Sequence, residues 1–188
     1  FSSRRRHTRY ISVTGVQTCA LPILTYDPRS AEVVARAGVP VVLMHHQGSP
    51  ETMQEAPYYP RGALVEVYFW LEDAIARAVD AGIDRAKIIV DPGIGFGKSV
   101  AHNLELMNGL AAFHALGCPL LVGASRKRTI GALHNEAPAD RRLGGSLALA
   151  LKAVDQGAQL VRAHDVYETV QALRVWRGLK DQALTPRL

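Results

Sequence analysis

Residues 87–99 read KIIVDPGIGFGKS, and this stretch decides the fold class. Its first part, Lys87 to Val90, is a short apolar run typical of a buried strand. Asp91 follows, and then come glycines at positions 93, 95 and 97, which permit close backbone approaches that a side chain would block. The stretch therefore predicts a buried strand whose carboxyl end continues into a loop wrapped around a ligand.

The glycine loop matches neither of two common phosphate-binding patterns. Gly97-Lys98-Ser99 fits the end of a Walker motif, but Pro92 occupies the position of the first glycine. The dinucleotide-binding pattern fails because Lys98 stands where its third glycine belongs. Taken alone, the loop is equally well explained as a turn-rich connection. Asp91 at its start is what makes it indicate a binding site.

Similar apolar runs recur along the chain and alternate with amphipathic stretches. The four runs are Val41 to Met44, Lys87 to Val90, Leu120 to Gly123 and Leu160 to Ala163. The intervals between them are long enough for a helix and loops in each crossover of a parallel sheet. The alternation predicts an α/β fold built of four βα units.

Amphipathic segments with three-to-four spacing of apolar residues fill these intervals. They run from Pro28 to Ala37, Ala63 to Ala81, Ser99 to about Leu116, Gly144 to Gln156 and Val166 to Arg177. In the second segment Leu64, Val67, Leu71, Ile75 and Val79 form one apolar face. Ser99 is a suitable N-cap. These segments are predicted as helices that contribute core positions.

Composition excludes several classes of protein. The net charge of +5 is largely due to four arginines before residue 25, where no acidic residue occurs. The rest of the chain is close to neutral and only 6% of all residues are aromatic, which argues against a nucleic-acid binder. Cys19 and Cys118 form no closely spaced set, so neither a zinc site nor a disulfide framework is indicated, and a cytoplasmic setting fits. No run approaches the roughly 18 apolar residues of a membrane span.

Residues 1–24 differ from the rest because they show neither helical nor strand periodicity. Polar residues interrupt their apolar part, which argues against a signal peptide. The segment resembles translated sequencing-adapter remnants. We predict that residues 1–24 are non-native, that residues 25–188 form the folded domain, and that the native protein extends further toward its N-terminus.

Polar side chains follow each apolar run. They are His45, His46 and Gln47 after the first run, Asp91 and its loop after the second, Ser125, Arg126 and Lys127 after the third, and Arg162, His164 and Asp165 at the fourth. The active sites of parallel α/β sheets and barrels lie at the carboxyl ends of the strands. We therefore expect a carboxylate, an ammonium, a guanidinium and an imidazole to converge on one pocket.

The motifs DPGIGFGK, GASRK and RAHDV, in this order, resemble the later motifs of the dihydropteroate synthase family, and VVLMHHQGSPETMQ resembles the strand and loop before them. The resemblance covers about Asp27 to Leu179. It implies the C-terminal four βα units of a TIM (β/α)8 barrel, incomplete in this chain. It also implies transfer of the 7,8-dihydropterin-6-ylmethyl group from its diphosphate to para-aminobenzoate in folate biosynthesis.

The resemblance implies a role for each residue of the predicted site. It assigns Asp91, Lys127, Gly95 and Met44 to the pterin, Phe96 and Ser125 to para-aminobenzoate, and Arg162 and His164 to the diphosphate. Arg162, His164 and Lys127 are the implied catalytic residues. A carboxylate suits the paired N–H groups of a pterin edge, and a helix start near Ser125 favours an anion. Arg162 and His164 alternate on one strand and should share a face.

Each assignment has an ordinary structural alternative. Asp91 could be a helix cap or a loop residue, Lys127 a solvated lysine, and Ser125 a cap without a ligand. The Arg162 and His164 pair could be buried and satisfied, and Met44 could fill the core. No role is predicted for His45, because the neighbouring His46 departs from the methionine the family often has there. Arg126 is predicted to be structural, and His7, His102, His114 and His134 to lie at the surface.

The resemblance also implies a cofactor and partners. Mg2+ would assist diphosphate departure, with its ligand in the N-terminal half, so no metal ligand is predicted in this chain. Small-molecule substrates are expected, and a homodimer would suit the complete enzyme. Four strands cannot close the barrel, so the chain alone is predicted to be unstable or inactive. Two alternatives stay open: an inactive pterin-binding fragment, and a corrinoid-dependent pterin methyltransferase domain, against which the SRK and RAHD motifs argue.

Overall fold

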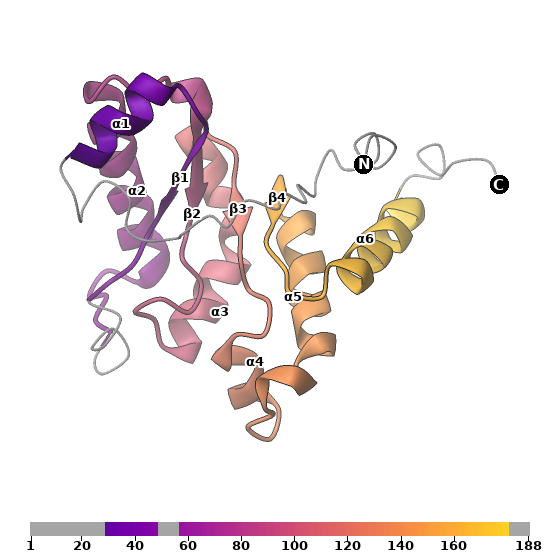
Figure 1. The fold of residues 1–188 in the computed structure, drawn as a ribbon. Helices are drawn as coiled ribbons and strands as arrows, with labels where there is room; N and C mark the ends of the chain where they lie inside the picture. The colour runs from indigo at the N-terminus through magenta and orange to yellow at the C-terminus, as the bar shows by residue number, and fades with distance from the viewer. Residues whose placement is uncertain (1–28, 49–56, 181–188) are drawn as a thin grey trace.

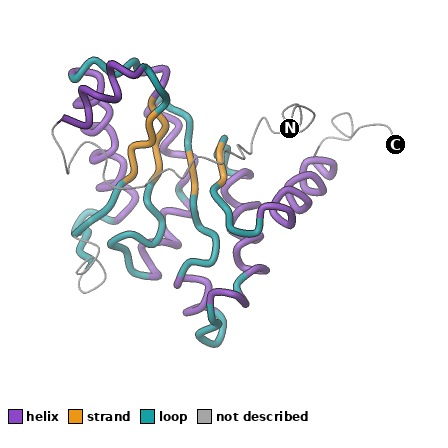
Figure 2. Tube along the Cα trace, viewed as in Figure 1, coloured by secondary structure: helices purple, strands orange, loops and turns teal. Residues whose placement is uncertain are grey.

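The computed structural model describes residues 29–48 and 57–180. Within them, short strands lie side by side in chain order, flanked by helices (Figure 1, Figure 2). The strands are β1 (Val41–Met44), β2 (Ile88–Asp91), β3 (Leu121–Val122) and β4 (Leu160–Val161). β1 pairs in parallel with β2, and β3 with β4, while a parallel bridge from Val90 to Leu120 connects the two pairs. The carboxyl ends of the described strands therefore meet at one edge.

Helices follow each of these strands. α1 (Arg29–Ala37) precedes β1, α2 (Ala63–Asp80) follows it, α3 (Val100–Asn108) follows β2, α4 (Arg128–Leu133) and α5 (Leu143–Asp155) follow β3, and α6 (Val166–Lys180) follows β4. Short 3-10 helices span Arg85–Lys87, Leu110–Leu116 and Ala139–Arg141. α2 contacts β1 and α3, whereas α5 contacts β4 and α6. All four apolar runs contain strands, so the α/β prediction is confirmed.

The core lies between α2, α3 and the first three strands. Val67 and Leu71 of α2 are completely buried and share this core with Ile88, Val90 and the 3-10 helix Leu110–Leu116. Each fully buried aliphatic side chain stabilises the fold by about 1.5–3 kcal/mol. The β4 side is thinner, because both residues of β4 are half-buried and α6 buries only Thr169 and Leu173.

Several predicted boundaries are wrong. The helix predicted from Ser99 to Leu116 ends as α3 at Asn108 and continues as a 3-10 helix. A Cβ on Gly109 would lie 2.5 Å from Cδ2 of Leu64, so the Leu64 side chain of α2 packs directly on Gly109 at the end of α3. Val79, predicted on the apolar face of α2, is 41% exposed. The six-residue helix α4 is too short to show an apolar period and was not predicted.

Two histidines predicted at the surface are instead half-buried and have partners. Ser99 caps α3, as predicted, and its Oγ accepts a bond from the His102 backbone at 3.2 Å, while the Ser99 N–H donates to His102 Nδ1 at 3.3 Å. His114 Nε2 lies 2.9 Å from the carbonyl oxygen of Gln156. His134 is exposed, as predicted, and His7 lies outside the described residues.

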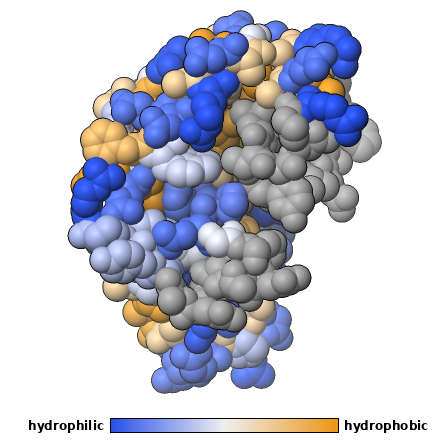
Figure 3. All heavy atoms as spheres, turned by 90° about the vertical axis from the view of Figure 1, so that its left-hand side faces the viewer, coloured by the Kyte–Doolittle hydropathy of each residue, from blue (hydrophilic) through white to orange (hydrophobic). Residues whose placement is uncertain are grey.

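The face on the α2 side carries mainly hydrophilic residues with separate hydrophobic spots between them (Figure 3). Exposed hydrophobic residues on α2 are Val65, Phe69 and Val79. Scattered exposure of this kind is usual for folded chains. None of the helices in the described ranges combines the length and the apolar character needed to cross a bilayer.

The start of α2 is capped by a side chain from another helix. The carboxylate of Glu105, on α3, accepts bonds from the Ala63 N–H at 3.2 Å and the Leu64 N–H at 3.0 Å. We expect Glu105→Ala to lower the free energy of unfolding by about 1 kcal/mol, because the first N–H groups of a helix lose both acceptor and charge. Glu105→Gln keeps an acceptor and should cost less. Urea unfolding measures both, and an unchanged midpoint for the alanine variant would contradict the cap.

Candidate active site

Asp91 ends β2 and lies at the centre of the polar edge. Its side chain is 7% exposed, and Oδ1 accepts the Gly93 N–H at 2.7 Å. Burial raises the pKa of Asp91 to about 6. The Gly93 hydrogen bond and the charges of Lys98, Lys127 and Arg162 lower this pKa, but by less than burial raises it. Three cations from separate segments therefore act on one buried carboxylate. The structure thus brings Lys127 and Arg162 near enough to Asp91 to act on its charge, whereas His164, the imidazole of the predicted set, contacts Ser125.

The glycine loop packs directly against the backbone of the segment that follows β1. Gly93 has a φ of 68°, and a Cβ there would lie 1.8 Å from the carbonyl oxygen of His45. Met44, opposite Asp91 in the β1–β2 register, is buried, which fits both a core role and a place beside the carboxylate. A Cβ on Gly95 would lie 2.9 Å from Cδ of Lys127, so the loop also contacts the lysine stem.

Lys127 lies over the ring of Phe96. Its Nζ is 3.8 Å from the ring centroid, a cation–π contact of the kind worth about 0.5–2 kcal/mol. Burial lowers the pKa of Lys127, and the positive charge of Arg162 lowers it further. The negative charge of Asp91 acts in the opposite direction. The two residues predicted to hold different substrates, Lys127 and Phe96, are thus in contact with each other. Lys127 is half-buried and forms the N-cap position of α4, so it is not a freely solvated lysine.

Sequence reasoning missed a second lysine. Lys98 is 2% exposed, and its Nζ lies 2.8 Å from His45 Nδ1 and 3.0 Å from the carbonyl oxygen of Phe96. Burial lowers the pKa of Lys98 to about 7, with Asp91 acting in the opposite direction, while burial and Lys98 hold the pKa of His45 at about 2. His45 is therefore neutral, and its Nδ1 can accept a hydrogen bond from Lys98 Nζ. A lysine inside an otherwise apolar glycine loop was the signal available in the sequence.

Asn103, also missed, connects three parts of the site. Its Oδ1 accepts the Gly95 N–H at 2.7 Å, and its Nδ2 donates to Thr129 Oγ1 at 3.0 Å and to the Ser99 carbonyl at 2.8 Å. The side chain is 3% exposed. One buried amide on α3 thus ties the glycine loop to α4, whose N-cap is Lys127.

Replacing Asn103 by leucine should lower the free energy of unfolding by about 2–4 kcal/mol, because the buried Thr129 hydroxyl and the half-buried Gly95 N–H each lose the hydrogen bond to Asn103 at similar side-chain volume. Asn108→Leu is the matched control, since Asn108 is exposed at the end of the same helix and should change stability by less than about 0.5 kcal/mol. Chemical unfolding of the two variants compares them directly. Equal losses would show that the network does not hold the site.

Ser125 and His164 meet between the loops that follow β3 and β4. Ser125 is 8% exposed, and its Oγ accepts the His164 N–H at 3.2 Å and lies 3.1 Å from His164 Nδ1. The expected alternation of Arg162 and His164 on a strand is wrong, because β4 ends at Val161. Both side chains lie in the following loop and are exposed, so the alternative of a buried pair is also excluded. Ser125 does not cap α4, which starts at Arg128.

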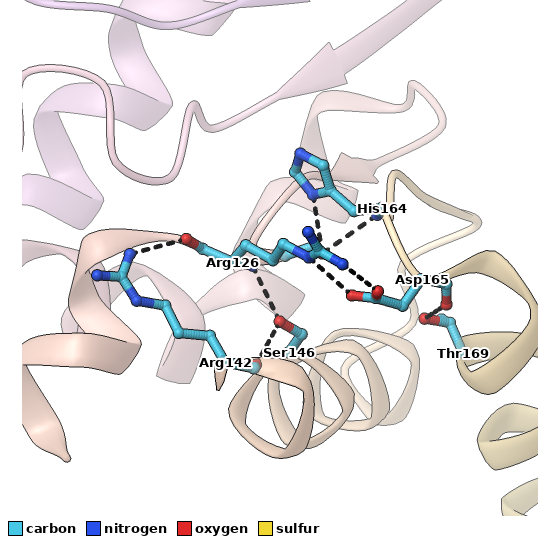
Figure 4. Close-up of polar contacts among 7 residues, drawn as sticks. Arg126, Arg142, Ser146, His164, Asp165 and Thr169 are labelled. Atoms are coloured by element: carbon cyan, nitrogen blue, oxygen red, sulfur yellow. Dashed lines mark hydrogen bonds and ion pairs between the residues drawn. The ribbon is translucent and has the colours of Figure 1, made fainter. Parts of the chain in front are cut away.

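Arg126 has the structural role predicted for it, with more partners than expected. Its guanidinium forms a paired contact with the carboxylate of Asp165, with Nε donating to Oδ2 at 3.1 Å and Nη2 to Oδ1 (Figure 4). Its backbone N–H donates to Ser146 Oγ at 2.9 Å, and its carbonyl accepts from Arg142 Nη1 at 3.0 Å. The segment 123–127 is therefore firmly held.

A bound Mg2+ would need oxygen ligands from the protein, the substrate or water. Among residues 29–48 and 57–180, no group of three or more His, Cys, Asp or Glu side chains is arranged to hold an ion. The Mg2+ implied by the resemblance, with its ligand expected in the N-terminal half, stays a prediction from sequence. Residues 1–24 and 49–56 lie outside the described part.

Parallel strands flanked by helices, with a buried carboxylate and cations at their carboxyl ends, define the class of an α/β enzyme with a polar rim site. The family described as pterin binding enzyme matches residues 12–164, and the chain belongs to it. The match begins before residue 25, and the predicted boundary there stays a prediction.

Relatives in this family are dihydropteroate synthases. The protein from Escherichia coli K12 is 51% identical over 149 residues, which cover 79% of this chain and 52% of that protein. The protein from Neisseria meningitidis serogroup B is 47% identical over 157 residues, covering 81% and 55%. The chain therefore spans about half the length of the curated relatives it matches.

Solved structures agree with this. The Yersinia pestis dihydropteroate synthase with a sulfonamide drug complex has 43% identity and a TM-score of 0.79, covering 82% of this chain and 56% of its own. The Xanthomonas albilineans enzyme with 4-aminobenzoic acid has 41% identity and a TM-score of 0.78, covering 88% and 57%. The likeness assigns the chain to the TIM-barrel type of fold.

Proposed function

We propose that this chain supplies the C-terminal four βα units of a dihydropteroate synthase. The reaction joins the pterin-methyl group of a pterin diphosphate to the amine of para-aminobenzoate. The identity of 40–51% to curated synthases supports it, as does the X. albilineans enzyme, which is described in complex with 7,8-dihydropteroate as well as with 4-aminobenzoic acid.

The single observation that carries the proposal is the environment of Asp91. Asp91 is a buried carboxylate at the end of a strand, and the charges of Lys98, Lys127 and Arg162 act on it; such a group is costly to keep, because burying charge costs free energy unless it is matched. It suits a ligand edge that offers two N–H groups, such as the pyrimidine side of a pterin. In the proposal, Lys127 contacts the same ring, and Met44 and Gly95 border it.

The remaining residues bind the leaving diphosphate and the attacking para-aminobenzoate. Arg162 and His164 bind the diphosphate, which leaves with the electron pair of the methylene carbon–oxygen bond. The amine of para-aminobenzoate then bonds to that carbon and releases a proton, while Phe96 borders its ring and Ser125 its carboxylate. Catalysis is electrostatic and positional, and no covalent nucleophile is needed. Magnesium, a homodimer and a cytoplasmic location remain predictions from sequence.

A complementation experiment tests the proposal. The 188-residue chain is expressed alone and fused behind the part of the E. coli synthase that the match leaves uncovered. We expect dihydropteroate formation from the fusion, lost on Asp91→Asn, and little or none from the chain alone. Turnover by the chain alone would contradict the need for a second half. A folded fusion that neither binds a pterin diphosphate nor turns over would overturn the function.

The match to the family described as pterin binding enzyme also fits a second candidate, a pterin-binding protein without turnover. Calorimetry with the pterin diphosphate separates the two. Binding by a fusion that forms no dihydropteroate would support the second candidate. The corrinoid-dependent alternative gains no support from the relatives named above.

A further inference from the structure

Two loops carry the residues proposed to hold the reacting groups, and strand pairing alone connects them weakly. The β3–α4 loop contains Ser125 and Lys127, and the β4–α6 loop contains Arg162 and His164. β3 and β4 pair over only two residues each. The Arg162 N–H still donates to the Val122 carbonyl at 3.0 Å. Beyond Arg162, something other than the strand ladder must set the distance between the loops.

The Arg126–Asp165 pair provides this connection. Arg126 lies between Ser125 and Lys127, and Asp165 directly follows His164. The two side chains meet through paired N–H to carboxylate contacts (Figure 4). Ser125 Oγ makes a second connection to His164, one residue earlier on each loop. The loops are therefore joined at two successive positions outside the sheet.

Neighbouring residues hold the backbone of both Arg126 and Asp165 in place. Arg126 has a φ of 57°, a conformation uncommon for a residue with a side chain, and it persists because Ser146 and Arg142 bind its N–H and carbonyl. Ser146 is 4% exposed, and its hydroxyl donates to the Arg142 carbonyl at 2.7 Å. On the other side, the Asp165 carbonyl accepts from Thr169 Oγ1 at 2.7 Å and from the Thr169 N–H at 3.0 Å.

We propose that Arg126 and Asp165 are positioning residues that fix the diphosphate-binding loop against the loop that holds the acceptor and the ring. The inference rests on the proposed function of Arg162 and His164. The pair itself touches no substrate. Losing it lets the β4–α6 loop shift, so diphosphate departure is supported less well, whereas Asp91 and the pterin ring are unaffected.

The test uses the turnover-competent fusion with Arg126→Met, Asp165→Asn and the double variant. We expect each single variant to lower kcat about tenfold to a hundredfold. The double variant should be no worse than the worse single, because both changes break one interaction. Affinity for inorganic diphosphate, by calorimetry, should fall about tenfold, while affinity for a pterin without diphosphate stays within about twofold.

Asp155→Asn is the matched control. Asp155 also joins α5 to α6, through an ion pair with Lys180 at 2.9 Å, but at the opposite end of these helices from the rim. It should leave kcat and both affinities unchanged. Additive losses in the double variant, or unchanged diphosphate affinity in the singles, would overturn the positioning role.

Hydrogen exchange separates failure of the pair from failure of the proposed function. Peptides covering residues 123–127 and 162–165 should exchange faster in Asp165→Asn than in the control, whatever the protein catalyses. If exchange is unchanged, the pair does not order the loops. If the unaltered fusion binds neither pterin nor diphosphate, the proposed function fails, and the positioning role fails with it even where exchange increases.

Discussion

Asp91→Asn is expected to weaken pterin binding by about a hundredfold, which corresponds to about 3 kcal/mol for two charge-assisted hydrogen bonds. Asparagine has nearly the same shape and keeps an oxygen to accept the Gly93 N–H, so the fold should survive. The loss follows from the charge, because the ligand edge loses its anionic acceptor and three cations lose their counter-charge. Calorimetry of the turnover-competent fusion measures it.

Asp73→Asn is the control for this variant, since Asp73 is exposed on α2 and should leave binding unchanged. If Asp91→Asn bound the pterin with normal affinity, Asp91 would not be the residue that binds it. Circular dichroism of both variants checks that they are folded.

The pH dependence of binding follows from the raised pKa of Asp91, which is about 6. Above this value the carboxylate is charged and affinity should be constant. Below it, protonation should reduce affinity by up to about tenfold per pH unit. For folding the sign is opposite, because the folded state holds this proton more tightly: the contribution to stability is present below the unfolded pKa and is lost as pH rises through about 6. Asp91→Asn should abolish both dependences. Calorimetry and urea unfolding from about pH 3.5 to about pH 8 would show whether it does, because the stability change lies between the unfolded and folded pKa values of Asp91.

Gly93→Ala is expected to lower the free energy of unfolding by at least about 3 kcal/mol, from a left-handed backbone and an overpacked contact together. The added carbon would lie 1.8 Å from the His45 carbonyl oxygen, and that atom belongs to the backbone. The clash cannot be relieved by a rotamer change. β1 and β2 would have to separate where the His45 N–H donates to the Asp91 carbonyl at 3.0 Å. A loss of this size is a large part of the stability of an ordinary domain.

Gly144→Ala provides the matched comparison. Gly144 lies in α5 with open space around it and should tolerate alanine, with a gain of up to about 1 kcal/mol. In urea, Gly93→Ala should unfold at a lower midpoint than the unchanged protein, and Gly144→Ala at an equal or higher one. Equal midpoints for both would show that Gly93 does not pack tightly against the His45 backbone.

The sequence predicted the parts of the fold that depend on local pattern. Apolar runs, helical periodicity and glycine stops are properties of neighbouring residues, so β1, β2 and most helices were located within a few residues. The strand ends were less well predicted, because pairing is decided by the partner strand. Arg162 accordingly lies beyond β4 although the apolar run continues through Ala163.

What the sequence by itself determined is the family and part of the rim, including Asp91, Lys127 and Arg162, because short motifs and the carboxyl ends of parallel strands specify both. The tertiary structure alone added Lys98 and Asn103 to the site and decided which residues touch. Lys98 with His45, Asn103 with Thr129, and Arg126 with Asp165 are joined across 53, 26 and 39 positions of the chain. Contacts at such separations depend on how packed segments are placed in space, which no local pattern of residues records.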